Sequence, residues 1–234
     1  RSPYPNSTWW VTEWNAWCKG CDDGILGEYN YAFAGKTVNY LLDLLQHGAR
    51  AALAWEGYDS YYEHHAPSPF SYWGMLAYQP DRKTYVPRPN FYAIQQVSRF
   101  VPVGSRRIFT TNLGDSIRTV AYYDSATQRL TLVGVNQTTR VQYADVMLSG
   151  LPAFDEVELY VTDDTRRVSK VATTRAQGKS FRLTLPQSSI FTITGRASVS
   201  QVAGSKPVGW YSGDIHVHRN CGDKRVLPEA DLPG

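Results

Sequence analysis

The residue pattern changes near Arg107, and this change constrains the fold more than any other feature of the sequence. Before it, segments with a helical spacing of apolar residues alternate with short runs of apolar and β-branched residues. After it, short segments are separated by turn residues, as in antiparallel β structure. The sequence therefore predicts an α/β segment followed by an all-β module.

The α/β segment is expected to contain four elements in the order strand, helix, strand, helix. Buried strands are predicted at 9–15 and 49–55, and helices at 36–47 and 90–101. Apolar residues recur on one side of each helix, and Gly48 is placed to end the first of them. This order is typical of parallel α/β folds.

The all-β module is expected to be a small antiparallel β-sandwich. The predicted domain boundaries are 1–106 for the α/β part, 107–195 for the sandwich, 196–208 for a polar linker and 209–234 for a further domain start. Six sandwich strands are predicted, at 119–123, 130–135, 141–148, 156–161, 181–185 and 190–194.

Composition and charge exclude some classes of partner. The net charge of +3 is spread along the chain, so nucleic acid is not an expected partner. No stretch approaches the roughly 20 consecutive apolar residues of a membrane-spanning helix. The chain holds 7 Trp and 16 Tyr, and this surplus fits either sugar binding on ring faces or aromatic packing in a core.

Cys18 and Cys21 form a single Cys-x-x-Cys motif in a loop-like stretch. A zinc site of the usual kind needs a second such pair, and a thioredoxin-type motif needs a βαβ context that this pattern lacks. A local disulfide or two structural thiols are the preferred interpretations. The sequence does not decide between them.

Glu13 lies at the end of the first predicted strand, between aromatic residues. A strand end holds a carboxylate rigidly, and a retaining glycosidase needs two carboxyl groups about 5–5.5 Å apart, one of them a nucleophile. Glu13 fits the nucleophile. A strand-end glutamate paired with a surface Lys or Arg is the alternative, and the residue pattern alone leaves both open.

Five segments carry a resemblance to a known family: Val-Thr-Glu-Trp-Asn at 11–15, Ala-Leu-Ala-Trp at 52–55, 72–76, 87–102 and 183–195. In this order they resemble the end of a clan A glycoside hydrolase, most closely families thirty and thirty-nine and some members of family five. The resemblance implies the last two units of a (β/α)8 barrel, with its seventh and eighth strands at 11–15 and 52–55, about six barrel units before Arg1 and a β-sandwich after the barrel.

The resemblance implies roles for single residues and a substrate class. Glu13 is implied as the nucleophile and Trp55 as the platform under the sugar next to the cleaved bond. The substrate is an oligo- or polysaccharide, no cofactor is needed, and the parent protein is expected to be secreted. Further candidates for binding sugar hydroxyls are Asn15, Glu56, Tyr58 and Asp59.

The acid/base residue of this family follows an Asn at the end of the fourth strand. By the resemblance, that strand lies before Arg1. Glu56 and Glu63 belong to the eighth strand or its loop and do not fill this role. The chain alone is therefore predicted to be inactive.

The segment from Gly213 to His218 resembles the opening strand of PHP-type (polymerase and histidinol phosphatase) metallohydrolases. On a strand, His216 and His218 point to the same face, so both could bind one divalent metal. The remaining ligands would lie beyond Gly234. Two surface histidines in a tail are the alternative.

Two other functions stay open beside the glycosidase. The chain could be a carbohydrate-binding or structural β-module, in which case Glu13 has no catalytic role. The main chemistry of the parent protein could instead belong to the metallohydrolase domain, which further His, Asp and Glu ligands after Gly234 would indicate.

Overall fold

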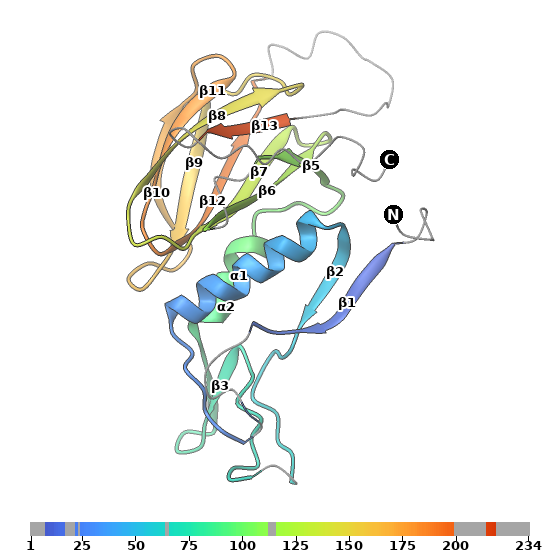
Figure 1. Cartoon of the computed structure of the whole chain (residues 1–234), viewed down its shortest axis with the longest axis vertical. Coiled ribbons are helices and arrows are strands. Elements are labelled where there is room, and N and C mark those ends of the chain that lie inside the picture. The colour runs from blue at the N-terminus through green and yellow to red at the C-terminus, as the bar shows by residue number, and fades with distance from the viewer. Residues whose placement is uncertain are drawn as a thin grey trace. The chain divides into compact units, whose positions relative to one another are not determined.

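The computed structural model consists of two compact units, and each is described by itself (Figure 1). The first unit ends at Gln95 and the second begins at Gln96. The described residues are 8–16, 22, 24–63, 66–111 and 116–198, together with the backbone of a strand at Asp214–His218.

The first unit is built on two parallel strands joined by a helix. Strands β1 and β2 pair in parallel, α1 connects them, and β3 and β4 form an antiparallel hairpin. The predicted order strand, helix, strand, helix is present, but the hairpin between β2 and α2 was not predicted. The elements are β1 (Trp9–Trp14), α1 (Tyr31–Gln46), β2 (Ala49–Ala54), β3 (Leu76–Gln79), β4 (Thr84–Pro87) and α2 (Pro89–Ser98), whose last residues belong to the second unit.

Helix α1 begins five residues before the predicted start. The Asn30 side chain caps it by accepting a hydrogen bond from the Phe33 N–H at 3.0 Å, which satisfies one of the free donors of the first turn. Phe33, Val38 and Leu42 lie on its buried side. The helix ends as predicted, because Gly48 follows with a φ of 94°, a conformation that favours glycine.

Both strands of the first unit were predicted to be buried, and this prediction is wrong for the chain as it folds here. Trp10 and Leu53 are exposed, while Trp14 and Ala49 are buried. Among the described residues β1 and β2 form a two-stranded sheet, so no third strand covers their edges. The ring of Trp14 packs edge-on against Tyr40 of α1 at 5.7 Å, which accounts for its burial.

The second unit is a β structure of nine strands hydrogen-bonded in the order β10-β9-β12-β7-β6-β5-β13-β8-β11. All six predicted strands are present, and β5 and β10 were missed. The strands are β5 (Arg106–Thr110), β6 (Ile117–Asp124), β7 (Arg129–Asn136), β8 (Gln142–Ser149), β9 (Glu156–Thr162), β10 (Ser169–Arg175), β11 (Ser180–Leu185), β12 (Ser189–Arg196) and β13 (Asp214–His218).

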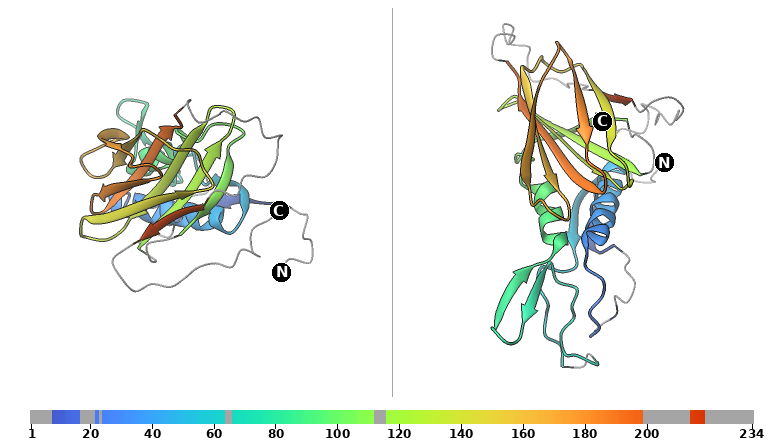
Figure 2. Two further views of the ribbon diagram at one scale, coloured as in Figure 1. Left: turned by 90° about the horizontal axis from the view of Figure 1, so that it is seen from above. Right: turned by 90° about the vertical axis from the view of Figure 1, so that its left-hand side faces the viewer.

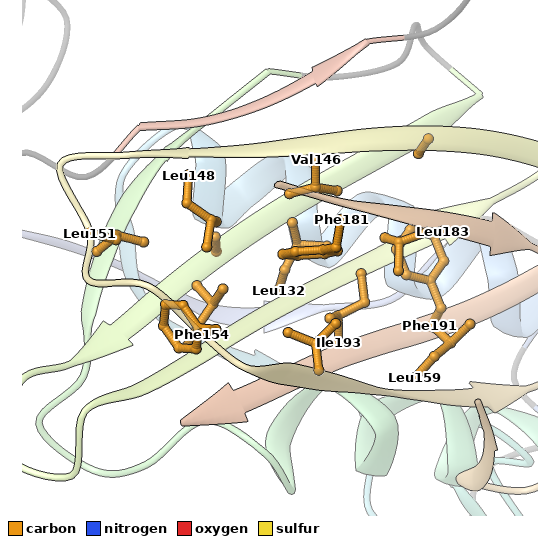
Figure 3. Close-up of a cluster of buried hydrophobic side chains, with 14 of the residues drawn as sticks. Leu132, Val146, Leu148, Leu151, Phe154, Leu159, Phe181, Leu183, Phe191 and Ile193 are labelled. Atoms are coloured by element: carbon orange, nitrogen blue, oxygen red, sulfur yellow. The ribbon is translucent and has the colours of Figure 1, made fainter. Parts of the chain in front are cut away.

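One apolar core holds the second unit together (Figure 3). Alternate residues of β8 and β11, such as Val146 and Phe181, point to the same side as Leu132 of β7 and Ile193 of β12. The residues between them on β8, such as Met147, are exposed, which is the period-two pattern of a strand with one buried face. The strands form one continuous sheet curved around this core (Figure 2).

The fully buried Gln96 of α2 is hydrogen-bonded to strands β9 and β12. Its side chain accepts from Thr162 Oγ1 at 2.7 Å and donates to the Tyr160 carbonyl at 3.2 Å, both in β9. Its own carbonyl oxygen accepts from Thr192 Oγ1 at 2.8 Å. Every polar group of this buried side chain is therefore used.

Strand β13 joins the sheet of the second unit by its backbone. It pairs in parallel with β5 and antiparallel with β8. The side chains of His216 and His218 lie outside the described part of the chain, so the metal pair and the PHP-type domain stay predictions. No helix among the described residues is long and apolar enough to cross a membrane.

Candidate functional site

The candidate site lies where the parallel strands β1 and β2 end, because parallel strands bring their carboxyl ends to one edge. Val11 pairs with Ala52 and Trp14 with Ala54, so three residues of β1 advance against two of β2. The register therefore shifts between these two pairs. Glu13 lies within the shifted segment and is exposed.

The backbone of Trp55 is held on both sides at this edge. Its N–H donates to the Trp14 carbonyl at 2.7 Å, and its carbonyl accepts from Asn15 Nδ2, also at 2.7 Å. The Asn15 Oδ1 accepts from the Ala16 N–H at 2.8 Å. The Trp55 side chain is 40% exposed, and the peptide bond from Trp55 to Glu56 is cis. The strand pairing thus places Glu13, Asn15 and Trp55 at one edge.

Glu56 was predicted to bind sugar hydroxyls, but its carboxylate is buried and already bound. One oxygen accepts from Ser60 Oγ at 2.7 Å and the other from Ser71 Oγ. Both serines belong to the loop that follows β2. The Glu56 carboxylate therefore links Ser60 and Ser71 to the start of this loop.

Asp59, the other acidic candidate, is buried deeper and has more partners. Arg88 donates to both of its oxygens, at 2.6 and 2.9 Å, in a bidentate ion pair. The N–H groups of Gly74 and Tyr78 donate to the same oxygens, each at 3.0 Å. A carboxylate has about four acceptor positions, and here all four are filled. The geometry leaves Asp59 no position for a sugar hydroxyl.

Arg88, Tyr29 and Gly74 complete this network and were not predicted as site residues. The Arg88 guanidinium lies 4.6 Å from the centre of the Tyr29 ring and also donates to the Gly74 carbonyl. Burial raises the pKa of Tyr29 to about 12, against the opposing effect of Arg88 and with a further increase from Asp59. Arg88 falls inside the motif at 87–102, but its sequence position gives no sign of its buried partner.

Tyr58 is the candidate that stays accessible. Its side chain is exposed, and its backbone forms a parallel bridge with Leu76 at the start of β3. Its ring packs edge-on against Tyr85 of β4, with 5.8 Å between ring centres. The hairpin thus supports Tyr58 from one side.

The described residues contain no group of three or more His, Cys, Asp or Glu side chains that could hold a metal ion. Cys18 and Cys21 lie outside the described residues, so the prediction of a disulfide or two thiols stays open. The chemistry available at this edge is that of an exposed carboxylate on β1 and an exposed indole at the end of β2.

The comparisons with known proteins come from structure alone, because no family model and no curated protein matches the chain. A glycoside hydrolase family 30 subfamily 8 xylanase from Clostridium acetobutylicum is similar at a TM-score of 0.60 and 18% identity, covering 80% of this chain and 42% of that one. A bifunctional glucanase-xylanase from a metagenome library has a TM-score of 0.56 and 18% identity, covering 84% and 32%. The GH51 arabinofuranosidase from Xanthomonas axonopodis pv. citri has a TM-score of 0.56 and 16% identity, covering 83% and 42%.

These neighbours are clan A glycoside hydrolases, the group that the sequence motifs resemble. At such low identity the likeness shows a shared fold. The chain spans less than half the length of each of these enzymes.

Proposed function

We propose that the chain is part of a retaining glycoside hydrolase that cleaves O-glycosidic bonds, with Glu13 as the nucleophile. The parallel pairing of β1 and β2 carries the proposal, because it brings an exposed carboxylate and an exposed Trp55 to one strand edge. Catalytic groups at the carboxyl ends of parallel strands are the rule in barrel enzymes. The fold shared with clan A glycoside hydrolases supports the same assignment.

The reaction proposed is a double displacement. A carboxylate oxygen of Glu13 attacks the anomeric carbon while an acid protonates the leaving glycosidic oxygen. Water then attacks the resulting glycosyl ester, gives its proton to the same group acting as base, and releases Glu13. Trp55 offers its ring face to the C–H surface of the reacting sugar, and Asn15 holds the Trp55 backbone in place.

The acid/base carboxyl is proposed to come from outside these 234 residues, as the resemblance implies. Glu56 and Asp59 are the acidic residues nearest to Trp55 in the loop, and both are bound within the protein. We therefore propose that the chain alone has no turnover on aryl glycosides. Turnover that is lost on Glu13→Gln would contradict this part of the proposal.

Covalent trapping in the parent protein tests the nucleophile. An activated 2-fluoro glycoside should leave one sugar on the peptide that contains Glu13, and Glu13→Gln should abolish this label. Glu28→Gln is a matched control, since Glu28 is also exposed. Labelling that survives Glu13→Gln would overturn the assignment.

The substrates to test first contain pentoses, because the similar structures include xylanases and an arabinofuranosidase. Polymers of this kind are too large to cross a cell membrane, so we propose that the parent protein acts outside the cell. A parent protein that binds these polymers but is never labelled would instead favour the carbohydrate-binding module.

A further inference from the structure

Six aromatic side chains form a continuous series on the loop and hairpin between β2 and α2, named here the aromatic strip. Neighbouring rings lie within the distance range of favourable ring pairs. The ring centres are 5.8 Å apart for Tyr58 and Tyr85, 5.3 Å for Tyr78 and Tyr85, 4.8 Å for Phe70 and Tyr78, 5.6 Å for Tyr61 and Phe70, and 6.2 Å for Phe70 and Tyr72.

Three of the six rings of the aromatic strip are open to solvent. Tyr58, Tyr61 and Tyr85 are 56%, 61% and 44% exposed. Phe70 and Tyr78, between them, are partly buried and stacked on each other. The strip therefore combines supported rings with accessible ones.

The surroundings of the strip carry little net charge. The described residues from 56 to 88 include four acidic and three basic side chains. Asp59 is paired with Arg88, and Asp81 with Arg82. A ligand of this surface is therefore expected to be neutral.

The strip is continuous with the proposed active site. Tyr58 lies three residues after Trp55, and the Asp59 N–H donates to the Leu76 carbonyl at 3.0 Å, which fixes the loop to the hairpin. The buried pair of Asp59 and Arg88 secures the same segment. The loop that leaves the catalytic edge thus leads directly into the strip.

We propose that the aromatic strip binds a neutral polysaccharide chain and holds sugar units that lie beyond the one at Glu13. This inference rests on the proposed function. The C–H faces of pyranose rings pack on aromatic faces, and the exposed rings of Tyr58, Tyr61 and Tyr85 are open to such contacts. The tyrosine hydroxyls add hydrogen bonds to sugar hydroxyls at the rim.

The Tyr85 hydroxyl can take part in this binding. A tyrosine hydroxyl keeps its proton at neutral pH, so it can donate a hydrogen bond to a sugar oxygen.

Affinity electrophoresis of the 234-residue chain tests the inference, with soluble arabinoxylan or β-glucan in the gel. The wild-type chain should be retarded, and Tyr61→Ser should weaken the apparent affinity about tenfold, the loss expected for one stacking ring. Tyr61→Phe should keep most of the retardation because it keeps the ring. Tyr61 is suited to this test because it is 61% exposed and lies at one end of the strip, where its ring contacts Phe70.

The matched control is Tyr143→Ser, which removes a tyrosine of β8 that is 67% exposed and lies in the second unit. Its retardation should equal that of the wild type. Near-ultraviolet circular dichroism checks that each variant is folded.

Three outcomes would contradict polysaccharide binding by the aromatic strip. They are no retardation of the wild type by either polymer, equal retardation of Tyr61→Ser and the wild type, or a loss of retardation in Tyr143→Ser as large as that in Tyr61→Ser. Covalent labelling of Glu13 is read separately. A parent protein that is retarded but never labelled would contradict the glycosidase proposal and leave the binding proposal intact. A parent protein that is labelled but not retarded would contradict only the binding proposal.

Discussion

The side-chain amide of Asn15 donates a hydrogen bond of 2.7 Å to the carbonyl oxygen of Trp55, forty residues along the chain. This bond joins the carboxyl ends of β1 and β2. Together with the bond from the Trp55 N–H to the Trp14 carbonyl, it fixes the backbone under the exposed indole. The rigidity of the candidate site thus depends on a residue that was predicted as a sugar ligand.

Asn15→Ala should loosen this edge. A neutral hydrogen bond contributes about 0.5–1.5 kcal/mol, so the Trp55 N–H should exchange its hydrogen about fivefold faster. Asn15→Asp tests whether the edge is held by the bond to Trp55 or by the bond to Ala16. Asp still accepts from the Ala16 N–H but does not donate to the Trp55 carbonyl. If Asn15→Asp exchanges as slowly as the wild type, the bond to Trp55 is not what holds the edge.

Arg88→Met should destabilise the loop that carries Tyr58. It leaves the buried Asp59 carboxylate without a counter-charge, which typically costs about 3–5 kcal/mol. Hydrogen exchange at the N–H groups of Gly74 and Tyr78, which both donate to Asp59, should accelerate strongly.

Arg82→Met is the control for this change, since Arg82 forms an exposed pair with Asp81. Exposed pairs contribute about 0–1 kcal/mol, so exchange at Gly74 and Tyr78 should stay as in the wild type. Equal effects of Arg82→Met and Arg88→Met would show that burial of the ion pair between Asp59 and Arg88 does not determine hydrogen exchange at Gly74 and Tyr78.

The sequence predicts helices and strands whose apolar residues recur with a clear period. It does not predict which residues far apart in the chain contact each other. The strands at 130–135 and 190–194 were found because apolar and small residues dominate them. Strand β10 was missed because it is mostly exposed and polar, with Lys170 and Arg175 among its residues. In the hairpin, Lys83 adopts a φ of 51°, a turn conformation that is uncommon outside glycine.

The candidate site shows the same limit. The parallel pairing of β1 and β2 brings Glu13, Asn15 and Trp55 to one edge, which the α/β pattern implies, and their roles stay predictions. Glu56 and Asp59 looked like ligands because they are polar loop residues near Trp55. Their burial depends on Arg88, Ser71 and Gly74, which no local pattern connects to them.

Gly74→Ala should disrupt the loop, because Gly74 packs against the backbone of Tyr58 and Asp59. A Cβ atom there would lie 2.2 Å from the Asp59 nitrogen and 2.3 Å from the Tyr58 carbonyl carbon, which forces the backbone to move. We expect a lower thermal midpoint and faster exchange at Tyr78. Gly57→Ala is the matched control, since nothing lies within 4 Å of its Cβ. A midpoint lowered equally by both changes would contradict this explanation.

Alkaline pH should destabilise the first unit through Tyr29. Its pKa is about 12 in the folded chain, above the ordinary tyrosine value of 10.0, so the unfolded chain loses this proton first as pH rises. The contribution of Tyr29 to stability is complete below pH 10 and is lost between pH 10 and 12. Tyr29→Phe should reduce this loss in thermal unfolding at increasing pH. The same loss in both proteins would assign the effect to other groups.

Gln96→Ala should destabilise the second unit, because it leaves the Tyr160 carbonyl and the Thr162 hydroxyl without their buried partner. An unsatisfied buried polar group costs about 1–3 kcal/mol and the cavity adds to this, so we expect a loss of about 2–4 kcal/mol in urea unfolding. Gln95→Ala removes the neighbouring, only partly buried glutamine and should cost less than about 0.5 kcal/mol. A similar loss in both variants would show that the contact of Gln96 with β9 does not account for the loss, and helix propensity would not explain it either, because Ala forms helix more readily than Gln.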